Sequence, residues 1–282
     1  MCGLVGIYLN NNSNLEEERY EKVINDMATV QKHRGPDDKG VFVNKQEKLA
    51  FGFQRLSIID LNKNAGQPMI SKNKDWLIVY NGEIYNYRNL RKELNFKNSY
   101  WQTNSDTEVL LECIAKFGFL KTIKKLNGMF AIAIYDKRKQ TLFLARDRAG
   151  IKPLYYCKVG DSFHFASEIK AFFNLPFYKK EPCFESIDLF FSLKNIPSPK
   201  TAFKNTYQLE AGKILIVSKK GVIKKTFWDL NKKENYLKSD GNILEKIQDC
   251  LVNSVKKQLR SDVDVGCFLS GGLDSSAITV LA

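Results

Sequence analysis

The alternation of apolar and polar residues along the chain predicts a series of short strands in its first part. The run at 76–80 is almost continuously apolar, as expected for a strand that is covered on both faces. The short polar segment 136–140 lies between two apolar runs and indicates a hairpin. Strands are therefore predicted at residues 3–9, 49–59, 76–80, 129–135, 141–145, 154–157 and 163–166.

Three segments have the longer apolar period of a helix. They are residues 17–31, 86–95 and 106–117. The third follows Ser105, and Glu108 stands three positions later, which is a capping-box pattern. Helices interspersed with strands predict a layered α/β or α+β domain.

The second part of the chain changes character. Pro197 and Pro199 mark a loop, and a hairpin-like unit is expected from Leu209 to Trp228. A linker is predicted at 230–242, where the stretch 231–242 is polar. Apolar residues four positions apart then predict a helix, followed by an apolar strand at 263–269, a glycine-containing turn and a second helix start. The apolar positions of the first of these helices are Ile243, Ile247, Leu251 and Val255.

The composition is that of a folded globular protein. The chain has 282 residues, of which 44 % are hydrophobic and 27 % charged, enough for one large domain or two modest ones. No apolar run reaches the ~20 residues of a membrane span, and the first residues do not resemble a signal peptide. The expected location is the cytoplasm. Six cysteines without CxxC spacing argue against disulfides and against a zinc site, and no metal site is predicted.

The net charge of +13 raises the hypothesis of nucleic-acid binding. The chain has 35 Lys but only 9 Arg, and the excess charge is spread along its length. Arginine is the residue that contacts guanine and phosphate in bidentate fashion. The charge is better explained by biased composition, and neither a nucleic-acid nor a membrane partner is expected.

Cys2 is the first residue with distinctive chemistry. Removal of Met1 would leave it with a free α-amine, which places a soft nucleophile beside a base of near-neutral pKa. The alternative is a small buried residue at the start of a strand. His33 and His164 are the two histidines of the chain, and their spacing does not indicate a Cys–His pair.

A series of motifs follows Cys2. In chain order they are Cys2-Gly-Leu-Val-Gly-Ile7, His33-Arg-Gly-Pro-Asp37, Gln54-Arg-Leu-Ser-Ile-Ile-Asp60, Tyr80-Asn-Gly-Glu-Ile-Tyr-Asn86, Ser105-Asp-Thr-Glu108, Ala145-Arg-Asp-Arg-Ala-Gly-Ile-Lys-Pro-Leu-Tyr-Tyr156 and Phe165-Ala-Ser-Glu168. Together they resemble the glutaminase domain of class II glutamine amidotransferases over about residues 2–229. The resemblance implies a four-layer αββα sandwich of the N-terminal nucleophile hydrolase type, an α+β fold, as a domain at 1–229.

The resemblance also implies roles for six residues. Cys2 would attack the glutamine amide, and the Asn81 side chain with the Gly82 N–H would form the oxyanion hole. Glutamine would be held at its amino-acid end: Arg55 would bind the α-carboxylate, Asp106 the ammonium, and Glu83 is a further contact. Taken singly, each of these three charged residues could instead be an ordinary solvated one.

Other matched motifs are interpreted as structural. Arg34 to Asp37 would form a turn near the glutamine pocket. Arg146, Asp147 and Lys152 are expected to form an internal ion-pair network without a catalytic role.

A second group of residues lies near the end of the sequence. Ser270-Gly-Gly-Leu-Asp-Ser-Ser276 follows the predicted strand and precedes a helix, where backbone N–H groups can bind phosphate. The loop resembles that of ATP pyrophosphatases, which implies binding of ATP with Mg²⁺ and an α/β domain of which residues 243–282 would be the truncated beginning. The expected ATP-binding residues are Leu269, Ser270, Gly271, Gly272, Asp274, Ser275 and Ser276.

The order of the two parts resembles the glutamine-hydrolysing asparagine synthetase family. In that family ammonia from glutamine attacks an aspartate carboxylate that ATP has activated; this chain by itself is expected to keep only the glutaminase activity. Two alternatives stay open: an amidotransferase acting on a sugar acid in surface-polysaccharide synthesis, and a non-catalytic glutamine-binding module. The acceptor and the oligomeric state, including a homodimer, also stay open.

Overall fold

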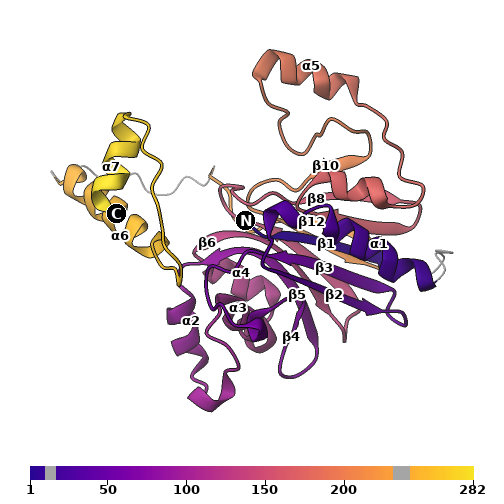
Figure 1. The fold of residues 1–282 in the computed structure, drawn as a ribbon, viewed down its shortest axis with the longest axis horizontal. Coiled ribbons are helices and arrows are strands. Elements are labelled where there is room, and N and C mark those ends of the chain that lie inside the picture. Colours follow the sequence, from indigo (N-terminus) through magenta and orange to yellow (C-terminus); the bar gives the residue numbers. More distant parts are fainter. Residues whose placement is uncertain (10–16, 231–241) are drawn as a thin grey trace.

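Two six-stranded antiparallel sheets form the body of the molecule, in a computed structural model that describes residues 1–9, 17–230 and 242–282 (Figure 1). The first sheet has the order β10-β8-β9-β1-β3-β2 and the second the order β12-β11-β7-β6-β5-β4. The strands are β1 (Gly3–Leu9), β2 (Asp38–Asn44), β3 (Leu49–Arg55), β4 (Met69–Ile70), β5 (Trp76–Ile84), β6 (Gly128–Asp136), β7 (Thr141–Arg146), β8 (Tyr155–Val159), β9 (Ser162–Ala166), β10 (Thr206–Gln208), β11 (Lys213–Ser218) and β12 (Gly221–Thr226).

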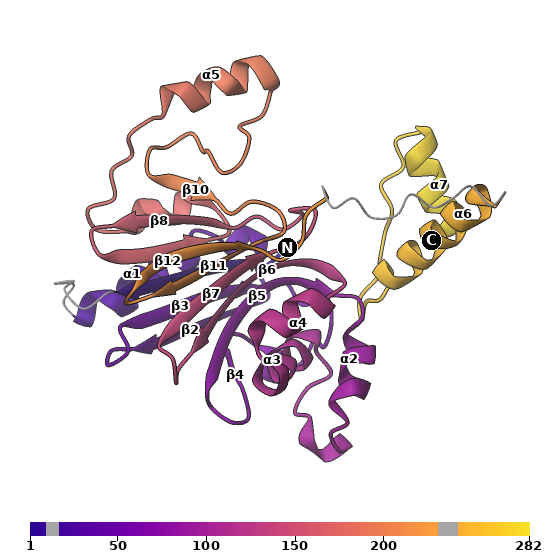
Figure 2. The ribbon, with the colours of Figure 1, turned by 180° about the vertical axis from the view of Figure 1, so that it is seen from behind.

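Helices cover the outer face of each sheet. The helices are α1 (Glu17–Thr29), α2 (Tyr87–Leu94), α3 (Asp106–Phe117), α4 (Phe119–Lys125), α5 (Phe184–Leu193), α6 (Ile243–Gln258) and α7 (Leu273–Leu281). Residues of α1 pack on β1, β3 and β9, while residues of α2, α3 and α4 pack on β5 and β6. Figure 2 shows α3 and α4 against the second sheet.

Apolar side chains pack between each sheet and its helices, and a separate apolar cluster fills the space between the two sheets. It contains Leu4 and Phe53 from the first sheet and Val79 and Leu144 from the second. Each strand that contributes to it alternates, so that neighbouring residues such as Tyr80 pack under the helices instead. The layers are therefore helix, sheet, sheet and helix, and the predicted αββα α+β sandwich is confirmed.

Several strand and helix boundaries differ from the predictions. The strand predicted at 49–59 ends at Arg55, and the strand predicted at 76–80 continues to Ile84. The helices predicted at 17–31 and 86–95 are slightly shorter, whereas α3 spans the predicted 106–117. Strand β5 extends beyond its predicted end because it pairs with β6 as far as its last residue, Ile84.

The part that follows β12 packs less closely. Of the predicted linker, residues 231–241 lie outside the described residues. Helix α6 begins at the predicted residue, Ile243, but of its predicted apolar positions only Val255 is buried. Helices α6 and α7 lie beside one another, away from the two sheets (Figures 1 and 2).

The strand predicted at 263–269 is wrong. These residues are exposed and have no regular secondary structure. A strand is stabilised by hydrogen bonds to a neighbouring strand. Among the described residues, none of the strands pairs with this segment.

Candidate active site

A cavity of about 570 Å³ lies at one end of the sandwich, where β1, β3 and β5 meet the start of α3. All six residues predicted for glutamine chemistry line it: Cys2, Arg55, Asn81, Gly82, Glu83 and Asp106. They come from both sheets and from a helix. The fold thus brings together residues that are up to a hundred positions apart in the sequence.

Cys2 precedes β1 and is held from two sides. Its Sγ accepts a hydrogen bond from the Leu56 N–H at 3.3 Å, and its carbonyl oxygen accepts one from Arg34 Nε at 3.0 Å. Burial raises the pKa of the thiol, although the Leu56 N–H and the charges of Lys152 and Arg55 act in the opposite direction. The Cys2 thiol is therefore fixed in place, and a base would have to remove its proton before it could act as a nucleophile.

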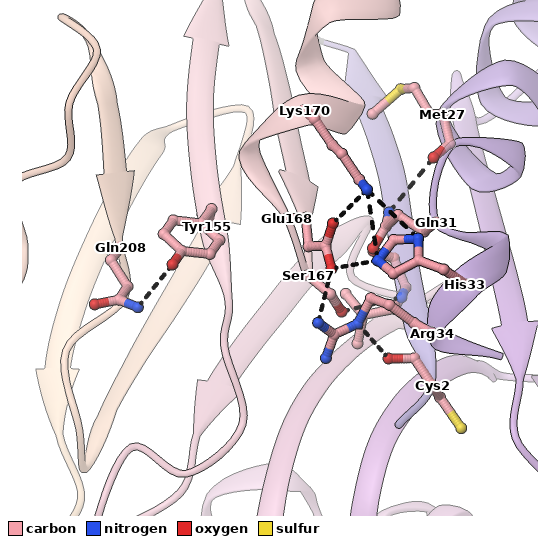
Figure 3. A network of polar contacts seen from close by, with 11 residues as sticks. Cys2, Met27, Gln31, His33, Arg34, Tyr155, Ser167, Glu168, Lys170 and Gln208 are labelled. Carbon is pink, nitrogen blue, oxygen red and sulfur yellow. Dashed lines mark hydrogen bonds and ion pairs between the residues drawn. The ribbon is translucent and has the colours of Figure 1, made fainter.

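Arg34 belongs to a network of charges behind Cys2 (Figure 3). The Glu168 carboxylate accepts hydrogen bonds from Arg34 and His33, both at 2.9 Å, and pairs with Lys170 at 3.1 Å. Burial opposes ionisation of Glu168, but the hydrogen bonds from Arg34, His33 and Lys170 outweigh it and lower its pKa to about 2. The Cys2 side chain points away from the network, so the network orients Cys2 through its backbone.

Gly82 lies on the free edge of β5. The N–H groups of Tyr80 and Ile84 point away from β6: the first donates to Gln67 Oε1 at 2.6 Å and the second to Asp106 Oδ2 at 2.8 Å. Alternation along an antiparallel strand gives the N–H of Gly82, midway between them, the same direction. It therefore faces the cavity rather than β6.

The position of Gly82 tolerates no side chain. A Cβ there would lie 2.1 Å from the carbonyl oxygen of Met129 and 2.8 Å from the Cα of Phe130, both on β6. These distances are far below van der Waals contact. Close approach of β5 and β6 therefore requires glycine.

Asn81 directs its side chain into the space between the sheets, as Val79 does two residues earlier. The residue is 1 % exposed, and its Nδ2 has no hydrogen-bond partner within the described chain. A buried polar group without a partner costs free energy. In return for this cost, the Asn81 Nδ2 donor remains available to an acceptor atom that enters the cavity.

Asp106 is the first residue of α3. Its Oδ2 accepts hydrogen bonds from Tyr80 Oη at 2.9 Å and from the Ile84 N–H at 2.8 Å. Burial raises its pKa despite these bonds, and it also raises the pKa of Tyr80 well above its ordinary value. A cationic group in the cavity would stabilise the ionised carboxylate.

The N-terminus of α3 is capped less fully than predicted. Ser105 Oγ accepts a hydrogen bond from the Glu108 N–H at 3.3 Å, as expected. The Glu108 carboxylate, however, accepts hydrogen bonds from the N–H groups of Gln102 and Thr103 rather than from Ser105. The reciprocal bond of a capping box is therefore replaced by bonds to the preceding loop.

Arg55 ends β3, and its guanidinium is almost fully buried. Nη1 donates to the carbonyl oxygen of Asn62 at 2.9 Å, and Nη2 donates to that of Asp60. Two of the five N–H donors are thus used to fix the side chain. The remaining donors can bind a carboxylate in the cavity.

The expected ion-pair network of Arg146, Asp147 and Lys152 is wrong. Arg146 donates to the backbone oxygens of Lys152, Leu209 and Gly150, and Asp147 accepts from backbone N–H groups, among them that of Lys152 at 2.9 Å. These bonds satisfy the turn that follows β7. The backbone N–H and C=O groups of this turn bind the Arg146 and Asp147 side chains, which therefore do not pair with each other or with Lys152.

Lys152 is a site residue that sequence reasoning missed. Its side chain is 6 % exposed and lines the cavity with Cys2 and Glu83. Burial lowers the pKa of Lys152 and raises that of Glu83, which Asp106 raises further. The available signal was a lysine in an apolar context within a matched motif.

The residues predicted to bind ATP lie outside this cavity: 269–272 are exposed and directly precede α7, whereas Asp274, Ser275 and Ser276 lie in the first turn of α7. Ser270 and Ser275 share a hydrogen bond of 3.0 Å between their hydroxyls, and Gly271 has a φ of +80°. Hydroxyl and N–H donors at the start of a helix fit phosphate oxygens. Within residues 1–9, 17–230 and 242–282, no cluster of three metal-ligating side chains occurs.

The helices of the described residues include none with both the length and the apolar character of a membrane span.

Two profiles of known families match the chain. Residues 1–228 match the glutamine amidotransferase domain, and residues 246–282 match asparagine synthase. A protein of Methanocaldococcus jannaschii named putative asparagine synthetase [glutamine-hydrolyzing] 2 is 40 % identical over 299 residues, which cover 99 % of this chain and 56 % of that protein. Asparagine synthetase [glutamine-hydrolyzing] 1 of Bacillus subtilis is 39 % identical over all of this chain and 44 % of its own length. The chain spans about half the length of these relatives.

Solved structures show the same fold. The glutamine phosphoribosylpyrophosphate amidotransferase of Bacillus subtilis, complexed with ADP and GMP, superposes with a TM-score of 0.58. It is 22 % identical, and the match covers 80 % of this chain and 49 % of that one. At this identity the likeness concerns the fold alone. The profile match over residues 1–228, together with the sandwich and its cavity, shows that the chain belongs to the glutamine amidotransferase domain family.

Proposed function

We propose that the chain hydrolyses glutamine to glutamate and ammonia through a thioester on Cys2. The observation that carries the proposal is the free Nδ2 of Asn81, which lines the same cavity as the thiol and the Gly82 N–H. Two donors beside a nucleophile are what acyl transfer needs to stabilise a tetrahedral oxyanion. Because the described residues give this buried donor no partner, it is available to such an oxyanion.

Removal of Met1 would complete the catalytic group. Met1 is more than half exposed and lines the cavity, so its loss frees the α-amine of Cys2 close to the thiol. The amine takes the thiol proton as the sulfur attacks the amide carbon, and returns it to nitrogen as the C–N bond breaks and ammonia leaves. Water then cleaves the thioester, which releases glutamate and restores the thiol.

The charges of the cavity suit the amino-acid end of glutamine. Arg55 offers its remaining N–H donors to the α-carboxylate. The buried Asp106 offers a carboxylate to the ammonium, and Glu83 lines the same cavity. The ammonium supplies the positive charge that offsets the burial of Asp106, so binding and ionisation support one another.

The relatives' names extend the proposal to amide synthesis in a longer protein. They are named as glutamine-hydrolysing asparagine synthetases, and the chain covers their glutaminase part. We infer that the Ser270 loop and the start of α7 would hold the phosphates of ATP, with Mg²⁺, and that ATP would activate an aspartate carboxylate for attack by ammonia. The described residues contribute the hydroxyl donors of Ser270 and Ser275 at the start of α7. The expected ligands of the longer protein are glutamine, aspartate and ATP.

The proposal is tested with the purified chain. Its intact mass should show loss of Met1, and glutamate should accumulate when glutamine is added. A diazo-ketone analogue of glutamine should add once, at Cys2, and the Cys2→Ala variant should form no glutamate. Binding of glutamine without glutamate release, or labelling that leaves Cys2 free, would contradict the proposal and favour a binding module.

A further inference from the structure

The segment that joins α6 to α7 contacts the wall of the glutamine cavity. The Asp60 N–H donates to Asp262 Oδ2 at 2.7 Å, and the Asp262 N–H donates to the Ile58 carbonyl oxygen at 2.9 Å. Arg260 Nη1 donates to the Tyr85 carbonyl oxygen at 2.7 Å. Farther along, Gly266 and Phe268 border the cavity itself. The second part of the chain is thus hydrogen-bonded to the loop that follows β3.

That same loop fixes Arg55. The carbonyl oxygens of Asp60 and Asn62 accept both of the hydrogen bonds that hold the guanidinium. Ile58 and Ile59 of this loop also line the cavity. The position of the loop therefore decides where the free N–H donors of Arg55 point.

Asp60 is the centre of the loop and adopts an unusual backbone conformation. Its φ is +56°, in the left-handed region that non-glycine residues occupy at a cost. Its side chain is buried: Oδ1 accepts from the Asn62 N–H at 3.1 Å and Oδ2 from the Asn104 N–H at 2.7 Å. These bonds fix the side chain, and the bond from Asp262 fixes the backbone N–H.

We propose that Asp262 is a positioning residue for glutamine binding. Its carboxylate holds the Asp60 N–H, so the Asp60 and Asn62 carbonyls keep the Arg55 guanidinium in the orientation that binds the α-carboxylate. The proposal rests on the proposed function of the cavity. It also means that the segment before the Ser270 loop is coupled to the glutamine site, because a displacement of Asp262 releases the loop that holds Arg55.

The test compares three variants of the full chain. Asp262→Ala removes the acceptor, Asp262→Asn keeps a side-chain oxygen that can accept the same bond, and Asp264→Ala removes an exposed carboxylate two residues away. We expect the KM for glutamine to rise about tenfold in Asp262→Ala with kcat within about twofold, from the usual strength of a hydrogen bond to a charged group. Asp262→Asn should recover most of the affinity, and Asp264→Ala should equal the wild type.

Alkylation of Cys2 gives a second readout. The concentration of diazo-ketone analogue needed for half-maximal labelling should rise with the KM, because this analogue has an α-carboxylate. Iodoacetamide has none, so its rate at the Cys2 peptide should not change. A structural role alone would alter unfolding of the variant without separating the two reagents.

The outcomes distinguish the two proposals. If the wild type hydrolyses glutamine and Asp262→Ala has an unchanged KM, or loses kcat alone, the positioning role is overturned while the glutaminase stands. If the wild type forms no glutamate but Asp262→Ala still weakens labelling by the diazo-ketone, the glutaminase fails and the positioning role is supported. Slower iodoacetamide labelling in Asp262→Ala would overturn the positioning role, because it would place the effect at the thiol.

Discussion

Replacement of Asn81 by alanine separates catalysis from stability. The amide donor stabilises the oxyanion in the proposed mechanism, and loss of one such donor lowers kcat by about 10²–10³, or ~2.7–4 kcal/mol. The effect on folding should be small. Nδ2 has no partner within the described chain, so its removal relieves a desolvation cost of ~1–3 kcal/mol. A small cavity left by the missing atoms costs about as much. The free energy of unfolding should stay within ~1 kcal/mol of the wild type.

The assay measures glutamate release at saturating glutamine and urea unfolding on the same preparations. Asn86→Ala is a matched control, since Asn86 lies two residues after β5 and outside the cavity. Its side chain accepts from the Asn127 N–H and donates to the Lys125 carbonyl oxygen. This control should lose ~1–2 kcal/mol of stability with kcat unchanged. A kcat within threefold of the wild type in Asn81→Ala would refute the oxyanion role, and a large loss of stability would refute the claim that its donor is free.

Three further variants test the surroundings of the site. Gly82→Ala should lose ~2–4 kcal/mol of stability in urea unfolding, because its Cβ would lie 2.1 Å from the Met129 carbonyl oxygen; an unchanged midpoint would contradict this packing. Glu168→Gln should lower the free energy of unfolding by ~1–2 kcal/mol at neutral pH. A pKa lowered from 4.5 to about 2 corresponds to ~3 kcal/mol, and screening by solvent near Lys170 and His33 reduces this value. A depressed pKa stabilises above pH 4.5 and its effect fades as the pH falls toward 2, so the difference from the wild type should shrink over that range, and a constant difference would contradict the charge network. Lys152→Met should move iodoacetamide alkylation of Cys2 to higher pH, because Lys152 lowers the pKa of the thiol; an unmoved profile, like that expected of the exposed Lys158→Met, would show that the two do not interact.

The apolar pattern predicted most of the sandwich because it records burial directly. Helix α3 begins and ends where the pattern places it, since its apolar residues face the second sheet continuously. The strand predicted at 263–269 has an equally clear pattern but no pairing partner among the described residues. A pattern reports what a segment can bury, and the hydrogen-bonded neighbour decides whether a strand forms.

The site shows the same division. The motifs predict Cys2, Arg55 and Asp106 as site residues because their order and spacing resemble a known family, and the structure places all three around one cavity. For Lys152 the sequence predicts only an ion-pair network with Arg146 and Asp147. In the structure those neighbours bond to backbone groups of the turn, and the lysine side chain lines the cavity. Whether two charged side chains pair therefore depends on the backbone groups around them, which can bind the same side chains instead.

By itself the sequence determined the order of the motifs and the two periods that separate strands from helices, and it predicted Cys2 as the nucleophile. These depend on residue type and spacing alone. The tertiary structure decided that the Gly82 N–H faces the cavity and that Asn81 Nδ2 has no partner among the described residues. It also decided that Glu168 orients Cys2 through Arg34, and that Asp262 holds the loop of Arg55. Each of these depends on groups far apart in the chain meeting at hydrogen-bond distance, which no local pattern encodes.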